Sequence, residues 1–340
     1  MKTKQILGIV VAAAAVVVIG VTGVASNILQ EKMTASSEKA SEKVTYDFMD
    51  YGMAEELSLP TEDFVGQINI VGEIGPSAEE SVWGTTESTY DHDLYMEYVD
   101  QMIEADNNKG IMLYINSPGG TVYESDELYL KLMEYKEKTG RPIWAYFGSE
   151  ACSGGYYIGM AADKIYANRN CWTGSIGVIV SLLNCKDLYD KIGIKEIDIT
   201  SGANKAMGSS GLDLTEEQYD ILQSLVDEAY DQFVDIVATG RKMDEKTVRE
   251  LADGRIYSAK QALDVKLIDA IGSFEEEKAA FAKEAKLDEE ITYYEPENAG
   301  WSLFANLFGA IKDLKPQSEL ELATDIVENN GNGVLKYYAK

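Results

Sequence analysis

The segment KGIMLYINSPGGTVYESDELYLKLMEYKEKTGRPIWAYFG, residues 109–148, decides the fold. It begins with a short apolar run, turns at Ser-Pro-Gly-Gly, continues with helical spacing to Gly140 and returns to a second apolar run. Short apolar runs between turn signals predict buried strands. Strands that alternate with helices are typical of an α/β fold with a mostly parallel sheet.

The same alternation continues on both sides of this segment. A long amphipathic helix is predicted for residues 214–243, where Thr215 can cap the first turn, and its apolar stripe would serve core packing or a subunit contact. The other elements that we expect are strands at 66–74, 164–167, 175–180 and 194–200 and helices at 94–106, 154–162 and 185–192.

Charge and cysteine content exclude several classes of protein. The chain has 58 acidic and 30 basic residues and a formal net charge of -28, so nucleic acid is not an expected partner. Cys152, Cys171 and Cys185 follow no CxxC spacing, and with a single histidine in the chain no zinc site of the usual kind can form. We therefore expect neither a metal nor another cofactor.

The N-terminus predicts a membrane anchor. Residues 6–25 are almost wholly apolar, long enough to cross a bilayer and preceded by Lys2 and Lys4. Because positive charge stays cytoplasmic, the rest of the chain would be extracytoplasmic on a single-pass anchor. Small residues at 23–26 leave a cleavable signal peptide as the alternative. The predicted divisions are an anchor (1–29), a polar stalk (30–62), a folded domain (63–285) and a C-terminal extension (286–340).

Two glycine-containing segments carry candidate catalytic groups. In ACSGG, residues 151–155, Ser153 follows a strand and opens a helix, where a serine is either a nucleophile or a simple helix cap. In SPGG, residues 117–120, the turn can aim a backbone N–H into open space, as an oxyanion hole requires, or can merely join strand to helix.

A serine nucleophile needs a base, and the chain offers few. The single histidine, His92, lies at a predicted helix start among aspartates, a context more typical of a surface residue than of a catalytic base. A lysine can act if burial or a nearby cation lowers its pKa by several units. Lys164, Lys186, Lys191 and Lys195 are all expected to be solvated. Lys205, in SGANKAMGSSG, has no acidic residue between Asp198 and Asp213 and is the best candidate for a desolvated lysine. Ser175 precedes a predicted strand and can orient that amine.

Four segments together resemble the signal peptide peptidase family of the S49 class, in its short bacterial form. They are INSPGG, ACSGGYYIGMAADKIYA, TGSIGVI and SGANKAMGS, and the resemblance covers about residues 65–285. It implies the crotonase and Clp-protease type of fold. It also implies a homo-oligomeric ring in which each protomer completes a neighbour's site, and hydrolysis of residual signal peptides.

The resemblance also assigns roles to matching positions. Ser153 matches the nucleophile, Lys205 the general base and Ser175 the residue that hydrogen-bonds the lysine. Gly120 resembles an oxyanion donor, with the N–H of Gly154 as the second donor. Cys152 departs from the family, whose members carry a small residue there.

Two other functions remain open from the residues. A crotonase-like acyl-thioester enzyme would use the same glycine turns, although an acidic, membrane-anchored chain suits an anionic cofactor poorly. A non-catalytic membrane scaffold would use the long helix and the C-terminal extension to organise partners.

Overall fold

The computed structural model describes residues 59–77, 90–288, 290–296 and 336–338, the last three by their backbone alone. The predicted anchor and most of the predicted stalk lie outside the described residues. Among the helices of the described part, none is both long enough and apolar enough to cross a bilayer.

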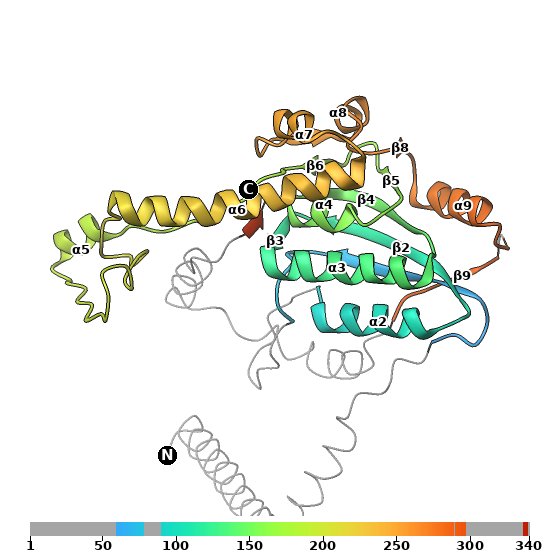
Figure 1. Ribbon diagram of the computed structural model, residues 1–340, viewed down its shortest axis with the longest axis horizontal. Coiled ribbons are helices and arrows are strands. Elements are labelled where there is room, and N and C mark those ends of the chain that lie inside the picture. Colours follow the sequence, from blue (N-terminus) through green and yellow to red (C-terminus); the bar gives the residue numbers. More distant parts are fainter. Residues whose placement is uncertain (1–58, 78–89, 289, 297–335, 339–340) are drawn as a thin grey trace, which may run out of the picture. The chain divides into compact units, whose positions relative to one another are not determined.

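A mostly parallel sheet forms the centre of the fold (Figure 1). Within the described residues, eight strands join in the order β7-β6-β4-β2-β1-β9, with β5 and β8 reached through β4. All their pairings are parallel except that of β6 with β7, so the predicted α/β class is confirmed. These strands are β1 (Phe64–Val71), β2 (Asn108–Ser117), β4 (Ile143–Cys152), β5 (Lys164–Ala167), β6 (Trp172–Gly174), β7 (Ile256–Ser258), β8 (Ala270–Ile271) and β9 (Thr292–Tyr294).

Helices cover both faces of this sheet because successive strand residues point to opposite sides. On one face Ile115 packs against α4, and on the other Tyr114 and Trp144 make ring contacts with α9. The two faces are therefore both apolar, as a parallel sheet requires. The helices of the body are α2 (His92–Glu104), α3 (Val122–Thr139), α4 (Gly154–Gly159), α7 (Glu245–Leu251), α8 (Ala259–Asp264) and α9 (Phe274–Ala285).

Helix α6 (Glu216–Arg241) confirms the predicted long helix and its Thr215 cap. Thr215 and Gln218 form a reciprocal capping box, which supplies partners for free N–H groups of the first turn. Phe233 and Val237 in the C-terminal half are fully buried, whereas Tyr219 near the N-terminus is 59% exposed. The apolar stripe of α6 is thus covered along only half of its length.

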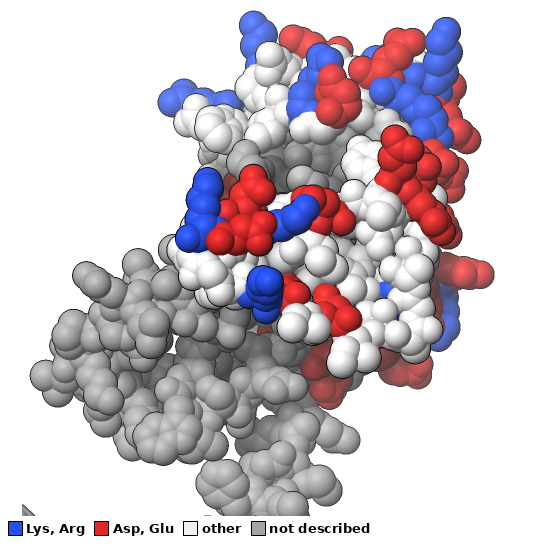
Figure 2. Space-filling model, turned by 90° about the vertical axis from the view of Figure 1, so that its left-hand side faces the viewer, with Lys and Arg blue, Asp and Glu red and all other residues white. Residues whose placement is uncertain are grey.

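The uncovered half of α6 belongs to a segment that we call the arm, residues 178–225, which also contains α5 (Lys186–Ile192). Figure 1 places α5 at the end of α6 that lies away from the sheet. Figure 2 faces this side and shows uncharged surface between scattered charged side chains. The exposed large apolar residues of the arm are Ile179, Leu183, Leu188, Ile192, Ile194, Ile197, Ile199, Leu212, Leu214, Tyr219 and Leu225.

Two predicted strands are wrong. Residues 175–180 and 194–200 belong to no strand of the structure. The alternation in IKEIDIT is typical of a half-buried strand, but Ile197 and Ile199 are 79% and 98% exposed, because the described part of the protomer places no neighbouring strand beside them.

The carboxyl of Glu277, on α9, is buried without a hydrogen-bond partner for either oxygen. Burial raises the pKa of Glu277 to about 9, against a smaller opposing effect of the Tyr166 backbone. The unfolded chain ionises this group near pH 4.5. The free energy of unfolding therefore falls as pH rises from about 4.5 to about 9, because the folded state keeps a proton that the unfolded state has lost.

The substitution Glu277→Gln should remove this pH dependence. At pH 7 the variant should gain about 3 kcal/mol in free energy of unfolding and at pH 4 almost nothing, as measured by denaturant unfolding. Glu275→Gln, at a carboxylate that is 81% exposed on the same helix turn, is the matched control and should leave the pH profile unchanged. Equal stability of Glu277→Gln and the natural protein at pH 8 would contradict the assignment.

Candidate active site

Ser153 occupies the junction between β4, which ends at Cys152, and α4, which begins at Gly154. Its φ of 54° is unusual for a residue with a side chain, and such strain persists only where the surrounding structure holds it. The side chain makes no cap hydrogen bond to α4, so the interpretation as a simple helix cap is wrong. Ser153 is fully buried, and its Oγ has no hydrogen-bond partner in the structure.

The neighbouring Cys152 is not a competing nucleophile. Burial, reinforced by the charge of Glu150, raises the pKa of the Cys152 thiol to about 12. Because the thiolate is the reactive form, this cysteine is inert at neutral pH. The unpartnered Ser153 hydroxyl is the better nucleophile at this junction.

Gly120 lies in the short strand β3 (Gly119–Thr121), opposite Ile74. The Ile74 amide donates to Gly119 O at 2.8 Å, and the Thr121 amide donates to Ile74 O at 2.9 Å. Since alternate residues of a strand direct their backbone groups to opposite edges, the N–H of Gly120 points away from Ile74. A Cβ on Gly120 would lie 1.8 Å from Ile74 O, so only glycine fits this close approach.

The edge of β3 that faces away from Ile74 is paired with strand β10 (Lys336–Tyr338). The pairing is antiparallel and sets Tyr337 opposite Gly120. An extended stretch of this chain therefore lies along the edge to which the Gly120 N–H points.

Gly154, the first residue of α4, lies beside the same strand. A Cβ on Gly154 would be 3.3 Å from the Gly120 N and 2.4 Å from Ser125 Oγ. The structure thus brings Ser153, Gly154 and Gly120 together, and free N–H groups at a helix start suit a developing negative charge.

Ser175 also lies at this site. The Ser153 amide donates to the carbonyl of Gly174 at 2.8 Å, which fixes the end of β6 against the Ser153 junction. Ser175 follows directly, is only 6% exposed and has a φ of 49°. Its amide donates to Arg255 O at 2.8 Å.

Lys205 lies apart from these residues. It is exposed, in contrast to the desolvated lysine that we expected. Its loop is tied to the start of α6 by a hydrogen bond of 3.3 Å from Gln218 Nε2 to Ala203 O. Helix α6 is joined to α4 fourteen residues after Gln218, where Gln232 Nε2 donates to Tyr157 Oη at 2.7 Å.

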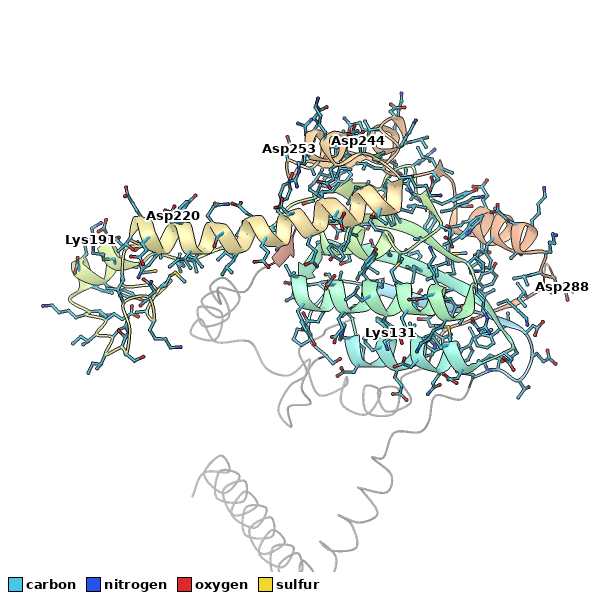
Figure 3. The ribbon with its side chains drawn as sticks, viewed as in Figure 1. Lys131, Lys191, Asp220, Asp244, Asp253 and Asp288 are labelled. Atoms are coloured by element: carbon cyan, nitrogen blue, oxygen red, sulfur yellow. The ribbon has the colours of Figure 1, made fainter. Side chains whose placement is uncertain are left out.

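This spacing decides whether Lys205 can reach Ser153 of the same chain. A rise of 1.5 Å per residue puts about 20 Å between Gln218 and Gln232, far more than a lysine side chain spans. Figure 3 labels Lys191 and Asp220 at the same far end of α6. Within one protomer Lys205 and Ser153 do not form a pair. Lys205 lines an open pocket of about 340 Å³ together with Asp198, Thr200 and Ser209.

His92 begins α2, as expected, but is not a surface residue. It is 5% exposed, and its ring nitrogens lie 2.8 Å from Tyr90 Oη and 2.9 Å from Glu127 Oε2. Both nitrogens are therefore engaged, Nδ1 with the residue two positions before α2 and Nε2 with Glu127 of α3. Among the described residues, no group of three or more His, Cys, Asp or Glu side chains is arranged to hold a metal ion.

Sequence reasoning missed two buried serines that shape the glycine turn. Ser125 Oγ donates to Thr121 O at 2.7 Å, and Ser117 Oγ accepts from the Gly119 amide at 3.1 Å. Ser125 lies one helical turn after Thr121, so its hydrogen bond to Thr121 could be predicted only if the first residue of α3 were known.

Comparison with known proteins extends these observations. Residues 135–288 match the model of peptidase family S49, and residues 85–173 match that of the Clp proteases. The chain is 38% identical over 237 residues to a candidate signal peptide peptidase, SppA, of Enterococcus faecium, which covers 69% of this chain and 68% of the relative.

Two further relatives match over a smaller share of this chain or of their own length. A candidate protease of Synechocystis is 41% identical over 55% of this chain and 66% of its own length. Protease 4 of Haemophilus influenzae is 32% identical over 73% of this chain but only 40% of its own length. The chain thus spans about two thirds of the first two relatives and less than half of the third. The matched families agree with the Clp-protease-like arrangement of sheet and helices, and the chain belongs to peptidase family S49 and is a serine peptidase.

Proposed function

We propose that the protein is a membrane-anchored serine endopeptidase that uses a Ser-Lys dyad to hydrolyse residual signal peptides and other extended peptides. The observation that carries this proposal is the Ser153 hydroxyl, buried and unpartnered on a strained strand-to-helix junction. It lies beside two backbone positions, Gly120 and Gly154, that suit an oxyanion.

The chemistry follows from these groups. The amine of Lys205 takes the proton of Ser153 Oγ as the oxygen attacks a peptide carbonyl carbon. The oxyanion accepts hydrogen bonds from the Gly120 and Gly154 amides, whose positions are fixed before the reaction. The peptide C–N bond then breaks, the leaving amine takes the proton from lysine, and water hydrolyses the acyl-enzyme. No cofactor takes part.

The base comes from a neighbouring protomer in this proposal. Lys205 is too far from its own Ser153, and the arm that carries it exposes many large apolar residues. Exposed apolar surface of this extent marks a protein contact. Packing of the arm against a second copy would bring Lys205 to that copy's Ser153 and Ser175. It would also bury the amine, which favours its uncharged form. Repetition of such a contact between copies closes a homo-oligomeric ring.

The substrate binds in this proposal as an extended strand. Strand β10 pairs with the edge of β3 that carries the Gly120 N–H, so this edge accepts an antiparallel segment. Strand addition supplies main-chain hydrogen bonds without regard to sequence. The segments around Ser153 and Ser175 are rich in Tyr, Trp, Met and Ile, which favours small or apolar side chains in the substrate. Lys2 and Lys4 before the apolar residues 6–25 support an extracytoplasmic catalytic domain at the cell membrane.

A fluorophosphonate probe tests this function, because it modifies activated serines. The full-length protein in detergent should be labelled at Ser153, as located by peptide mass spectrometry, and the Ser153→Ala variant should not. An assembled protein that stays unlabelled and hydrolyses an acyl thioester would instead be a crotonase-like enzyme. An assembled protein with neither activity would be a scaffold.

A further inference from the structure

Strands β2 and β4 contain an irregularity just before the active site. Ile115 pairs with Phe147, and the next pair is Ser117 with Ala151. Between these pairs β2 has one residue, Asn116, while β4 has three, 148–150. The extra residues of a bulge have no partners in the ladder, and their amide groups need other acceptors.

The side chain of Asn116 supplies the missing acceptor. Its Oδ1 receives hydrogen bonds from the Ser149 and Glu150 amides, both at 3.2 Å, and from Ser149 Oγ at 2.5 Å. The Asn116 backbone is meanwhile held by the Gly72 amide, which donates to Asn116 O at 3.1 Å. One carboxamide oxygen therefore fixes the whole bulge of β4 to a rigid point of β2.

The bulge determines where the nucleophile lies. Glu150 precedes Ser153 by three residues, and Asn116 precedes Gly120 by four. The contact therefore links β4, which leads to the nucleophile, with β2, which leads to the oxyanion donor Gly120. The register after the bulge sets Ala151 opposite Ser117 and Gly154 beside the Gly120 amide. Because side chains alternate between faces, loss of one bulge residue would turn Ser153 to the other face of the sheet.

We propose that Asn116 is a positioning residue that sets the placement of Ser153 relative to the oxyanion donors through the β4 bulge. It acts on Ser149 and Glu150, and it touches neither the substrate nor the reacting atoms. The proposal rests on Ser153 as the nucleophile. Loss of the Asn116 contact affects turnover rather than substrate binding, because the edge of β3 that pairs with an extended segment does not depend on the bulge.

The variants Asn116→Ala and Asn116→Asp test this role, with Asn107→Ala as matched control. Asn107 precedes β2 at the end opposite to Asn116, where its Nδ2 donates to Pro60 O and Glu62 O, both at 2.7 Å. The readouts are kcat and KM for a fluorogenic peptide amide of small apolar residues and the rate of fluorophosphonate labelling.

We expect Asn116→Ala to lower kcat and the labelling rate about 10- to 100-fold with KM within about twofold of the natural value, the size expected for a misplacement near 1 Å. Asn116→Asp, which keeps the acceptor oxygen, should regain most of the loss, and Asn107→Ala should show none. Ser149→Ala changes an exposed residue and removes only the hydroxyl donor. It should lower kcat about threefold even where Asn116→Ala does not fold.

An unchanged kcat in Asn116→Ala, an aspartate variant as slow as the alanine variant, or an equal loss in Asn107→Ala would each overturn the positioning role. An unchanged kcat in Ser149→Ala would also count against it. If the natural protein is neither labelled nor active on the peptide, the proposed function fails instead, so the two failures are distinguishable.

Discussion

Mixing inactive Ser153→Ala protomers with inactive Lys205→Ala protomers should restore peptide hydrolysis. Each variant alone should lose about 10⁴-fold in kcat, since nucleophile and base act as a unit. In a mixed ring, a site is complete where a Lys205→Ala protomer provides Ser153 and a Ser153→Ala neighbour provides Lys205. Random assembly from equal amounts makes about a quarter of the sites complete, so about a quarter of the natural turnover should return.

This result follows from the position of the arm. The loop that contains Lys205 is tied to the start of α6, about 20 Å along the helix from the contact with α4. The measurement is hydrolysis of a fluorogenic peptide after the two variants are dissociated, mixed and reassembled.

The control is Lys191→Ala, which removes an exposed lysine of the same arm (Figure 3) and should keep full activity. Activity in unmixed Lys205→Ala would remove this lysine from the mechanism. A mixture that assembles but stays inactive would mean that no neighbour supplies the base.

The sequence was sufficient for the body of the fold and for the junction at Ser153. Residues 109–148 have the strand, turn, helix and strand that their spacing predicts, because those elements are stabilised by contacts with their near neighbours in the chain. The same is true of α6, whose Thr215 cap is a local interaction.

The sequence was insufficient where the partners are remote or absent from the chain. IKEIDIT alternates like a half-buried strand, but in one protomer its isoleucines are exposed. The predicted burial of Lys205 was wrong in one protomer for the same reason, because the residues beside it in the sequence do not determine whether its side chain is covered. His92 was misjudged for the opposite reason: its partner Glu127 lies 35 residues away, across two helices.

Gly154→Ala should lower kcat about 100-fold although it keeps the backbone N–H. The new methyl group would lie 2.4 Å from Ser125 Oγ, and Ser125 is fully buried and bonded to Thr121 O. Because Ser125 cannot move aside, the start of α4 must shift away from β3. The amide of residue 154 then leaves the position at which it can donate to the oxyanion. The measurement is kcat for the fluorogenic peptide.

A second substitution separates this steric cause from a loss of glycine flexibility. Ser125→Ala removes the obstructing oxygen, so the double variant Gly154→Ala/Ser125→Ala should be faster than Gly154→Ala alone, by about tenfold, a coupling expected only for residues in contact. Gly155→Ala is the matched control, since its nearest neighbours, Ser117 O at 3.2 Å and Ile115 Cγ2 at 3.3 Å, need to yield by only a few tenths of an ångström. Its kcat should change by less than about threefold. A double variant as slow as Gly154→Ala would show that the clash with Ser125 Oγ is not the cause of the lower kcat.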